Sequence, residues 1–311
     1  MDEQLVSRIA YAADGIRLRV LDHTLNRRGG YLSQACSSAD VLASLYMSIL
    51  KLDELDQPLV PGPFSGVPSK EHPAVTGACY NGNGRRDCDN FILSPAQYAL
   101  PLYATLVETG RLDNVAMENY NIDGSSVEQI GAEHSPGMEV TTGSLGQGIS
   151  QAAGIAFARK RREDTGRVVV FLSDGECQSG EFWEAVQAMS FHKLNNMLMF
   201  VDINGYQCDG IMTSVMNIEP FDDRIRAFGG RVFRIDGHNI PLILETYQKA
   251  CVEPTDKPTF ILCDTDVCHH MDILRERSKF HYVRFSSQEE WQRYRDYYNE
   301  RMQERSEGWK F

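Results

Sequence analysis

Two apolar runs in the 311-residue chain are each followed by a residue with a side-chain oxygen, and this pattern restricts the fold more than any other feature. The run at 168–172 precedes Asp174, which begins an Asp-Gly-Glu sequence, and the run at 197–203 precedes Asn204. Residues 180–192 between the runs are long enough for a crossover helix, so the runs predict two buried parallel strands. Open α/β sheets bind ligands at the carboxyl ends of their strands, which places Asp174 and Asn204 at one binding edge.

The residue types at this edge also indicate a kind of ligand. Carboxylate and carboxamide oxygens are hard donors that suit Mg²⁺, which readily keeps phosphate oxygens and water in its octahedral shell. The chemistry that we expect is a metal ion holding a diphosphate. A second interpretation stays open, in which Asp174 caps the following helix and Asn204 with Gly205 forms a turn, because both residue types favour such positions.

The rest of the chain predicts an α/β fold with a mostly parallel sheet and helices on both faces. Further strands are expected near 91, 232 and 260. Apolar residues at helical spacing predict N-terminal helices over 5–25 and 38–52, the second with Asp40 in its first turn. Residues 58–86 are rich in Pro, Gly and Asn, which indicates an irregular excursion.

Residues 286–309 form a charged segment in which Trp291, Tyr294, Tyr298 and Met302 recur at helical spacing. We expect a terminal helix with one aromatic stripe. Two placements of this stripe stay open, either against its own domain or against a partner subunit.

Composition narrows the class of protein. A net charge of −12 disfavours nucleic acid and anionic membranes as partners. No apolar stretch approaches the roughly 18 residues that a membrane helix needs. The first residues lack a basic and apolar leader, so we expect a cytoplasmic protein.

Cysteine and histidine usage raises the question of a disulfide or zinc site. The eight cysteines lack the dense spacing of a disulfide scaffold, and we expect most to be reduced. Cys263, Cys268, His269 and His270 lie close together in the sequence, yet they contain no CxxC pair. We therefore do not expect a zinc site there.

An ordered set of motifs resembles transketolases, especially those made as two separate subunits. The sequences at 173–176, 183–185, 193–196 and 202–205 resemble the thiamine diphosphate motif of that family. The segment from Pro136 to Gly148, of sequence PGMEVTTGSLGQG, matches the same family, as do shorter stretches at 91–94 and 236–238. The resemblance spans about residues 5–285, and it implies a thiamine diphosphate-binding fold with thiamine diphosphate and Mg²⁺ as cofactors.

The resemblance also implies roles for individual residues. The metal ligands would be Asp174, Asn204 and the main-chain carbonyl of Tyr206. The cofactor would be contacted by Tyr31, Gln97, Gly143, Ser144, Leu145, Gly175, Glu176 and Asn204. Catalytic roles would fall to Gln97, Glu184 and His281, with Glu184 matching one carboxylate of a relay between paired sites and Ser179 replacing the other.

The chain departs from the family at several histidine positions. Tyr31 and Gln97 stand where the family has histidines, and Gln129 or Ile130 occupies a third such position. His281 loosely matches a retained histidine, although it also fits a surface residue. Glutamine can donate a hydrogen bond but cannot carry a proton near neutral pH. We therefore expect an enzyme other than a standard sugar-phosphate transketolase.

In the family, the glutamate beside the aminopyrimidine of the cofactor lies on a second, pyrimidine-binding domain, and this chain ends at Phe311 before one could occur. We expect residues 1–285 to form the diphosphate- and Mg-binding domain and residues 286–311 to form a C-terminal helix that is a possible partner contact. A separately encoded pyrimidine-binding subunit would complete the site in an α₂β₂ assembly.

Three functions stay open. The first is a transketolase-like transferase that moves a two-carbon ketol or acyl unit between small carbonyl substrates through a thiamine diphosphate adduct. The second is a component that decarboxylates a 2-oxo acid and forms an acyl or acyloin product. The third is a degenerate subunit with a structural or regulatory role.

Overall fold

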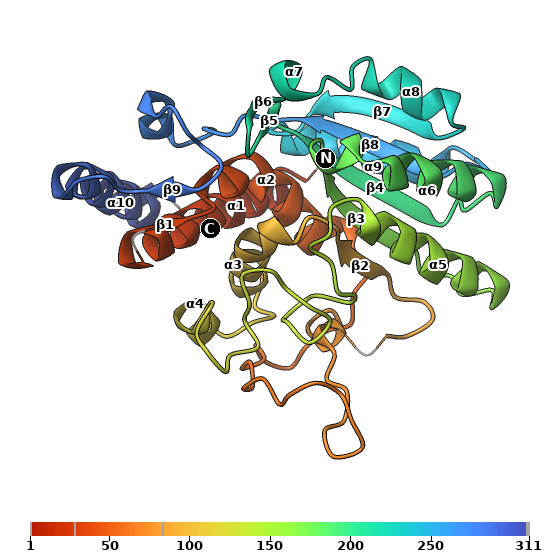
Figure 1. Cartoon of the computed structure of the whole chain (residues 1–311), viewed down its shortest axis with the longest axis horizontal. Coiled ribbons are helices and arrows are strands. Elements are labelled where there is room, and N and C mark those ends of the chain that lie inside the picture. Colours follow the sequence, from red (N-terminus) through yellow and green to blue (C-terminus); the bar gives the residue numbers. More distant parts are fainter. Residues whose placement is uncertain (1, 28, 83, 309–311) are drawn as a thin grey trace.

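The computed structural model describes residues 2–27, 29–82 and 84–308 (Figure 1). Residues 309–311 of the predicted C-terminal segment lie outside this range. At the centre is a five-stranded sheet in which all neighbouring pairs are parallel, in the order β2-β3-β4-β8-β7. The strands are β2 Asn90–Leu93, β3 Val168–Ser173, β4 Met197–Ile203, β8 Thr259–Asp264 and β7 Arg231–Asp236. The predicted parallel α/β fold is confirmed.

The central strands are buried on both faces, which explains why the sequence shows continuous apolar runs. Along β3, Val168, Val170 and Leu172 belong to one core cluster, whereas Val169 and Phe171 belong to the other. Successive side chains of a strand point to opposite faces, so each strand supplies both cores.

Helices cover both faces of this sheet (Figure 1). One core is shared with α1 Glu3–Arg27, α2 Leu32–Ser44, α3 Ala99–Glu108 and α9 Ile240–Val252. The other is shared with α5 Gln147–Arg161, α6 Gly180–Phe191 and α8 Phe221–Ala227. Shorter elements are α4 Val115–Asn119, α7 Met212–Val215, and the two-stranded pairs β1 Gly29–Gly30 with β9 Val283–Arg284 and β5 Tyr206–Gln207 with β6 Gly210–Ile211.

The register of the sheet brings four strand ends together. Ser173 of β3 lies opposite Asp202 of β4, and Ile203 lies opposite Asp264 of β8. On the other side, Leu93 of β2 lies opposite Phe171. The segments that follow β2, β3, β4 and β8 therefore leave the sheet at one edge, and α6 is the predicted crossover between β3 and β4.

The second N-terminal helix differs from the prediction. It begins at Leu32 and is followed by a π-helical turn over Leu45–Ile49, so Asp40 lies in the helix interior and is only 4% exposed. The reason is that Gly29 and Gly30 pair with β9, and the chain enters the helix directly afterwards. Over the described residues 58–82 and 84–86, the excursion is irregular as predicted, apart from a short 3-10 turn over Gly77–Tyr80 and isolated bridges at Leu59 and Pro63.

The terminal helix, α10 Gln288–Gly308, packs its aromatic stripe against its own chain. The Trp291 Nε1 donates a hydrogen bond to the Leu25 carbonyl oxygen at 2.9 Å, and Tyr294 is buried. Arg295 pairs with Asp22 of α1 at 3.2 Å. Trp291, Tyr294 and Tyr298 therefore pack within the chain, whereas Met302 is 40% exposed. Among the described helices, none has a stretch long and apolar enough to cross a membrane.

Candidate functional site

A cavity of about 410 Å³ lies at the edge of the sheet where the four strands end. Its walls come from the segments after β2, β3, β4 and β8 and from the start of α2. Among the predicted site residues, those that line it are Tyr31, Gln97, Leu145, Asp174, Gly175, Glu176, Asn204, Tyr206 and His281. Gly143, Ser144 and Glu184 are not part of its lining, and Glu184 is exposed on α6.

Asp174 and Asn204 both line the cavity, at the edge where the sequence predicts them. The Asp174 Oδ2 accepts a hydrogen bond from the Gly205 backbone N–H at 2.7 Å, and the Asn204 Oδ1 accepts one from the Tyr206 N–H at 2.9 Å. The latter contact is the expected turn. The capping role considered for Asp174 is wrong, because the N-terminus of α6 is capped by the Ser179 side chain, which accepts from the Phe182 N–H.

The Asp174 carboxyl is held in an environment that opposes its charge. Burial and the neighbouring charge of Asp202 raise the pKa of Asp174 to about 7. The carboxyl is only 1% exposed. A cation that contacts this side chain would reverse the shift and favour the ionised form.

Glu176 is a second buried carboxyl that clamps three segments together. It accepts hydrogen bonds from the Ser94 hydroxyl at 2.6 Å and from the backbone N–H groups of Gly146 and Ser173, both at 3.1 Å. These donors belong to the segment after β2, the turn before α5 and the end of β3. Burial raises the pKa of Glu176 to about 7.

Asp174, Glu176 and Asp202 give the site three buried carboxyl groups. Among the described residues that line the cavity, none is Lys or Arg. An ionised carboxylate that is buried without a counter-charge costs several kcal/mol. The donor set therefore fits a divalent cation, and Asp174 with Asn204 and Tyr206 would supply oxygen ligands to it.

The glycine-rich turn before α5 shapes the neighbouring wall. Gly143 and Gly146 have φ angles of 123° and 86°, which side chains rarely adopt. A Cβ at Gly146 would lie 2.0 Å from the Ser179 Oγ. The helix itself begins at Gln147, and Leu145 belongs to the preceding turn and lines the cavity.

Two of the substituted histidine positions, Tyr31 and Gln97, line the same cavity as His281. The Gln97 Oε1 is buried and has no hydrogen-bond partner among the described residues. The Tyr31 ring meets the His281 ring edge to face at 5.6 Å, and the Gln34 Nε2 donates to the His281 carbonyl oxygen at 3.1 Å. Burial lowers the pKa of His281. His281 is partly buried and lines the cavity, so it does not lie on an open surface.

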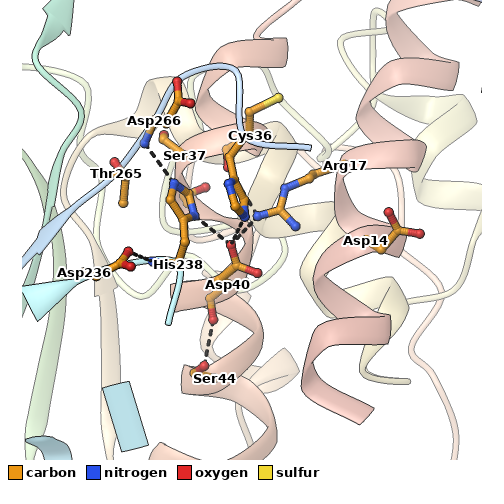
Figure 2. Close-up of polar contacts among 12 residues, drawn as sticks. Asp14, Arg17, Cys36, Ser37, Asp40, Ser44, Asp236, His238, Thr265 and Asp266 are labelled. Carbon is orange, nitrogen blue, oxygen red and sulfur yellow. Dashed lines mark hydrogen bonds and ion pairs between the residues drawn. The ribbon is translucent and has the colours of Figure 1, made fainter. Parts of the chain in front are cut away.

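A second cluster of polar groups surrounds Asp40 (Figure 2). The Asp40 Oδ2 contacts the Arg17 guanidinium and lies 2.8 Å from the His238 Nδ1 and 3.7 Å from the His269 Nε2. The ligand atoms of Asp40, His238 and His269 lie within 4.8 Å of one another, which is close enough for one metal ion to contact all three.

The ring geometry argues against a metal ion in this cluster. The imidazoles of His238 and His269 are stacked, with centroids 3.6 Å apart and planes 14° from parallel. A metal ion lies in the plane of each imidazole that binds it, so two stacked rings cannot share one ion. Arg17 already supplies a positive charge to Asp40, and the His238 Nε2 accepts from the Asp266 N–H at 2.8 Å. The cluster is an ion-pair network that joins α1, α2 and the segments after β7 and β8.

Three residues of the site, Asp202, Tyr98 and Ser94, were not predicted from the sequence. Asp202 is fully buried within β4 and accepts hydrogen bonds from Tyr98 and Asn204, and Ser94 binds Glu176. One signal was available, because an aspartate inside an otherwise apolar strand needs a partner. Nothing in the sequence pattern identifies that partner.

The parallel sheet and the acidic cavity at its carboxyl edge define an α/β protein with a candidate ligand site where the strands end. Comparison with known families matches residues 81–292 to the one described as transketolase, thiamine diphosphate binding domain. A putative uncharacterized transketolase family protein, y4mO of Sinorhizobium fredii, is 34% identical over 84% of each chain. The chain belongs to the transketolase family.

Other relatives are named as subunits. The 6-deoxy-6-sulfo-D-fructose transketolase subunit SqwG from a Clostridium species is 29% identical and is aligned over 85% of this chain and 86% of its own. An apulose-4-phosphate transketolase subunit of Actinobacillus succinogenes is 26% identical over 87% of this chain and 88% of its own.

Solved structures show the same fold. A transketolase from Campylobacter jejuni superposes with a TM-score of 0.74 at 19% identity, over 98% of this chain but 48% of that one. The chain therefore spans about half the length of the solved transketolases that it matches.

Proposed function

We propose that this chain is the cofactor-binding subunit of a bipartite transketolase-like transferase, which moves a two-carbon unit between small carbonyl substrates. The observation that carries the proposal is the group of three buried carboxyls at a cavity with no Lys or Arg in its described lining. Such a site is costly without a cation. A purely structural subunit would have no reason to keep it.

Different residues would bind the metal ion and contact the cofactor. Asp174, the Asn204 amide oxygen and the Tyr206 carbonyl would hold Mg²⁺. Leu145 in the turn before α5 and Gly175 after β3 would contact the cofactor. When bound, thiamine diphosphate supplies an electron sink for breaking and forming a carbon–carbon bond beside a carbonyl. Glu176 holds the Gly146 turn against the end of β3 and so keeps this wall in place.

The polar groups beyond the cofactor site favour a ketol donor over a 2-oxo acid. The buried Gln97 Oε1 is an acceptor in need of a donor, and a hydroxyl of a hydroxyketone provides one. The carboxylate of a 2-oxo acid offers only acceptors. It would also enter a cavity lined by Asp174, Glu176 and Asp209 without a described cation.

A separate pyrimidine-binding subunit is the proposed partner. Relatives of nearly the same length are named as transketolase subunits, and the solved enzymes are about twice as long. We place two copies of each chain in an α₂β₂ assembly in the cytoplasm. Glu184, exposed on α6, would then be free to act as a relay carboxylate between paired sites.

Turnover by the separate and combined chains tests this function. The purified chain, the partner and their co-expressed complex are each assayed with thiamine diphosphate, Mg²⁺ and an aldehyde acceptor. The donors are ketoses with and without a terminal phosphate and, for comparison, pyruvate. We expect turnover by the complex alone, with ketoses, and its loss in Asp174→Ala. Robust activity of the single chain would contradict the split site, and preference for pyruvate would favour the decarboxylating alternative.

A further inference from the structure

Asp202 occupies the centre of a hydrogen-bond network beneath the cavity. It is fully buried near the end of β4, and its carboxylate accepts hydrogen bonds from four side chains. The donors are the Ser37 and Tyr98 hydroxyls, each at 2.7 Å, the Thr265 hydroxyl at 2.5 Å and the Asn204 Nδ2 at 3.0 Å. They come from α2, the start of α3 and the segments after β8 and β4.

These contacts determine which way the Asn204 amide faces. A carboxylate is only an acceptor, so the edge of the amide that faces Asp202 must be its NH₂ group. The Tyr98 hydroxyl uses its proton on Asp202 and therefore accepts at 2.9 Å from the same Asn204 Nδ2. Both contacts hold Nδ2 inside the protein, which leaves Oδ1 on the side of the Tyr206 N–H.

We propose that Asp202 and Tyr98 are positioning residues that fix the Asn204 amide with its oxygen toward the metal. The inference rests on the proposed function, since it assigns a task toward the ion that Asp174 and Asn204 would hold. An unrestrained amide can turn by 180°, and it would then present NH₂ hydrogens to a cation. Fixing the amide removes this unproductive orientation before the ion arrives.

The network offers a matched control because Thr265 donates to Oδ1 of Asp202, whereas Tyr98 and Asn204 donate to Oδ2. Ser37 and Thr265 bind Asp202 but make no described hydrogen bond to Asn204. Substituting Thr265 by Val therefore disturbs the buried carboxylate at its other oxygen without removing either contact to the amide. Substituting Tyr98 by Phe removes one of the two contacts to Nδ2 and keeps the ring in place.

A charge-conserving exchange separates orientation from electrostatics. In Asp202→Asn the carboxylate is lost and the Asn204 amide can turn. In the double variant Asp202→Asn with Asn204→Asp, residue 204 has two equivalent oxygens, so its orientation no longer matters. The total charge of this double variant equals that of the wild type.

The test is Mn²⁺ affinity, measured by electron paramagnetic resonance with thiamine diphosphate present, on the complex of full-length chain and partner subunit. We expect Asp202→Asn to weaken Mn²⁺ binding by about 10- to 100-fold, the range typical for outer-shell partners of a metal ligand. Tyr98→Phe should weaken it less, Thr265→Val should stay near wild type, and the exchange variant should recover most of the loss.

Thermal unfolding of every variant reports whether it is folded, and Tyr98→Phe keeps the test decisive if Asp202→Asn does not fold. The inference is overturned if Asp202→Asn or Tyr98→Phe, whichever folds, binds Mn²⁺ like the wild type. It is also overturned if the exchange variant is as weak as Asp202→Asn, because the charge at position 202 would then be the cause. A wild-type complex that binds no Mn²⁺ contradicts the proposed function itself.

Discussion

At the scale of single residues, buried carboxyl groups line the site, and no described Lys or Arg lines it with them. Burial and Asp202 raise the pKa of Asp174 to about 7, whereas an unfolded aspartate has a pKa near 4. Between these pH values the folded chain binds more protons than the unfolded chain. The stability of the metal-free protein should therefore fall as the pH rises through this window.

Replacing Asp174 by asparagine tests this charge directly. In Asp174→Asn the introduced amide oxygen can still accept from the Gly205 N–H, but the buried charge is gone. Because one pKa unit corresponds to about 1.4 kcal/mol, we expect a gain on the order of 2–4 kcal/mol at pH 8 in a chelating buffer. Urea unfolding at pH 5 and pH 8 measures it. The gain should be larger at pH 8, and added Mg²⁺ should stabilise only the wild type. A less stable variant at pH 8 would contradict this account.

Gln97 provides a second prediction about the substrate. In Gln97→Met the shape is kept and the buried acceptor is removed. If Oε1 accepts from a donor hydroxyl, kcat/KM for ketoses should fall about fivefold, since a hydrogen bond contributes about 1 kcal/mol. Any residual reaction with pyruvate should be unaffected. Steady-state kinetics of the complex compares the two donors, and an equal loss for both would remove Gln97 from donor recognition.

The sequence predicts some residues of this site and misses others. Asp174 and Asn204 were predictable because each follows a buried strand at a spacing that only a parallel pair explains. Asp202 and Tyr98 were not, because they meet through side chains separated by 104 positions in the sequence. Periodicity locates elements, but it does not show which polar atoms face each other inside the protein.

At the scale of elements, the turn before α5 depends on glycine. Gly146→Ala would require a left-handed backbone for an alanine, which costs about 1–2 kcal/mol, and its Cβ would collide with Ser179. The control is Gly154→Ala in α5, where a Cβ meets no atom within 4 Å. That substitution should stabilise the chain by about 0.5–1 kcal/mol. Thermal unfolding compares them, and equal effects of both would show that the turn is not strained by a side chain.

The terminal helix yields a prediction that separates its two placements. Tyr294 is 2% exposed and packs in the core of its own chain. Tyr294→Ala should therefore lower stability by about 3–5 kcal/mol, as for other large aromatic truncations. Denaturant unfolding of the isolated chain is the measurement. A stable variant with weakened partner binding would instead place the stripe at an interface between subunits.

The elements themselves follow largely from local pattern. All five strands of the central sheet lie where apolar runs predict them, and α1 extends two residues beyond each end of its predicted range. The start of α2 was wrong by six residues because the pairing of Gly29 and Gly30 with β9 is a contact between distant parts of the sequence. Pairing between distant segments gives no signal in the local sequence pattern.

At the scale of the whole molecule, the chain corresponds to about half of a solved transketolase. The order of its sheet and the position of the cavity follow from parallel strands that end together. What the cavity lacks is a described cation and, on our proposal, the second half of the active site. Mg²⁺ and the partner chain are therefore expected to stabilise one another's binding, since both bind the folded chain at the same edge.

Calorimetry of thiamine diphosphate binding in the presence of Mg²⁺ tests the central claim most directly. The titration is made on the chain alone, on its complex with the partner subunit and on the complex carrying Asp174→Ala. The account predicts tight, Mg²⁺-dependent binding by the wild-type complex, and neither the chain alone nor the variant complex should match it. Absence of binding in all three samples would contradict the account and leave the chain as a structural component with a vestigial site.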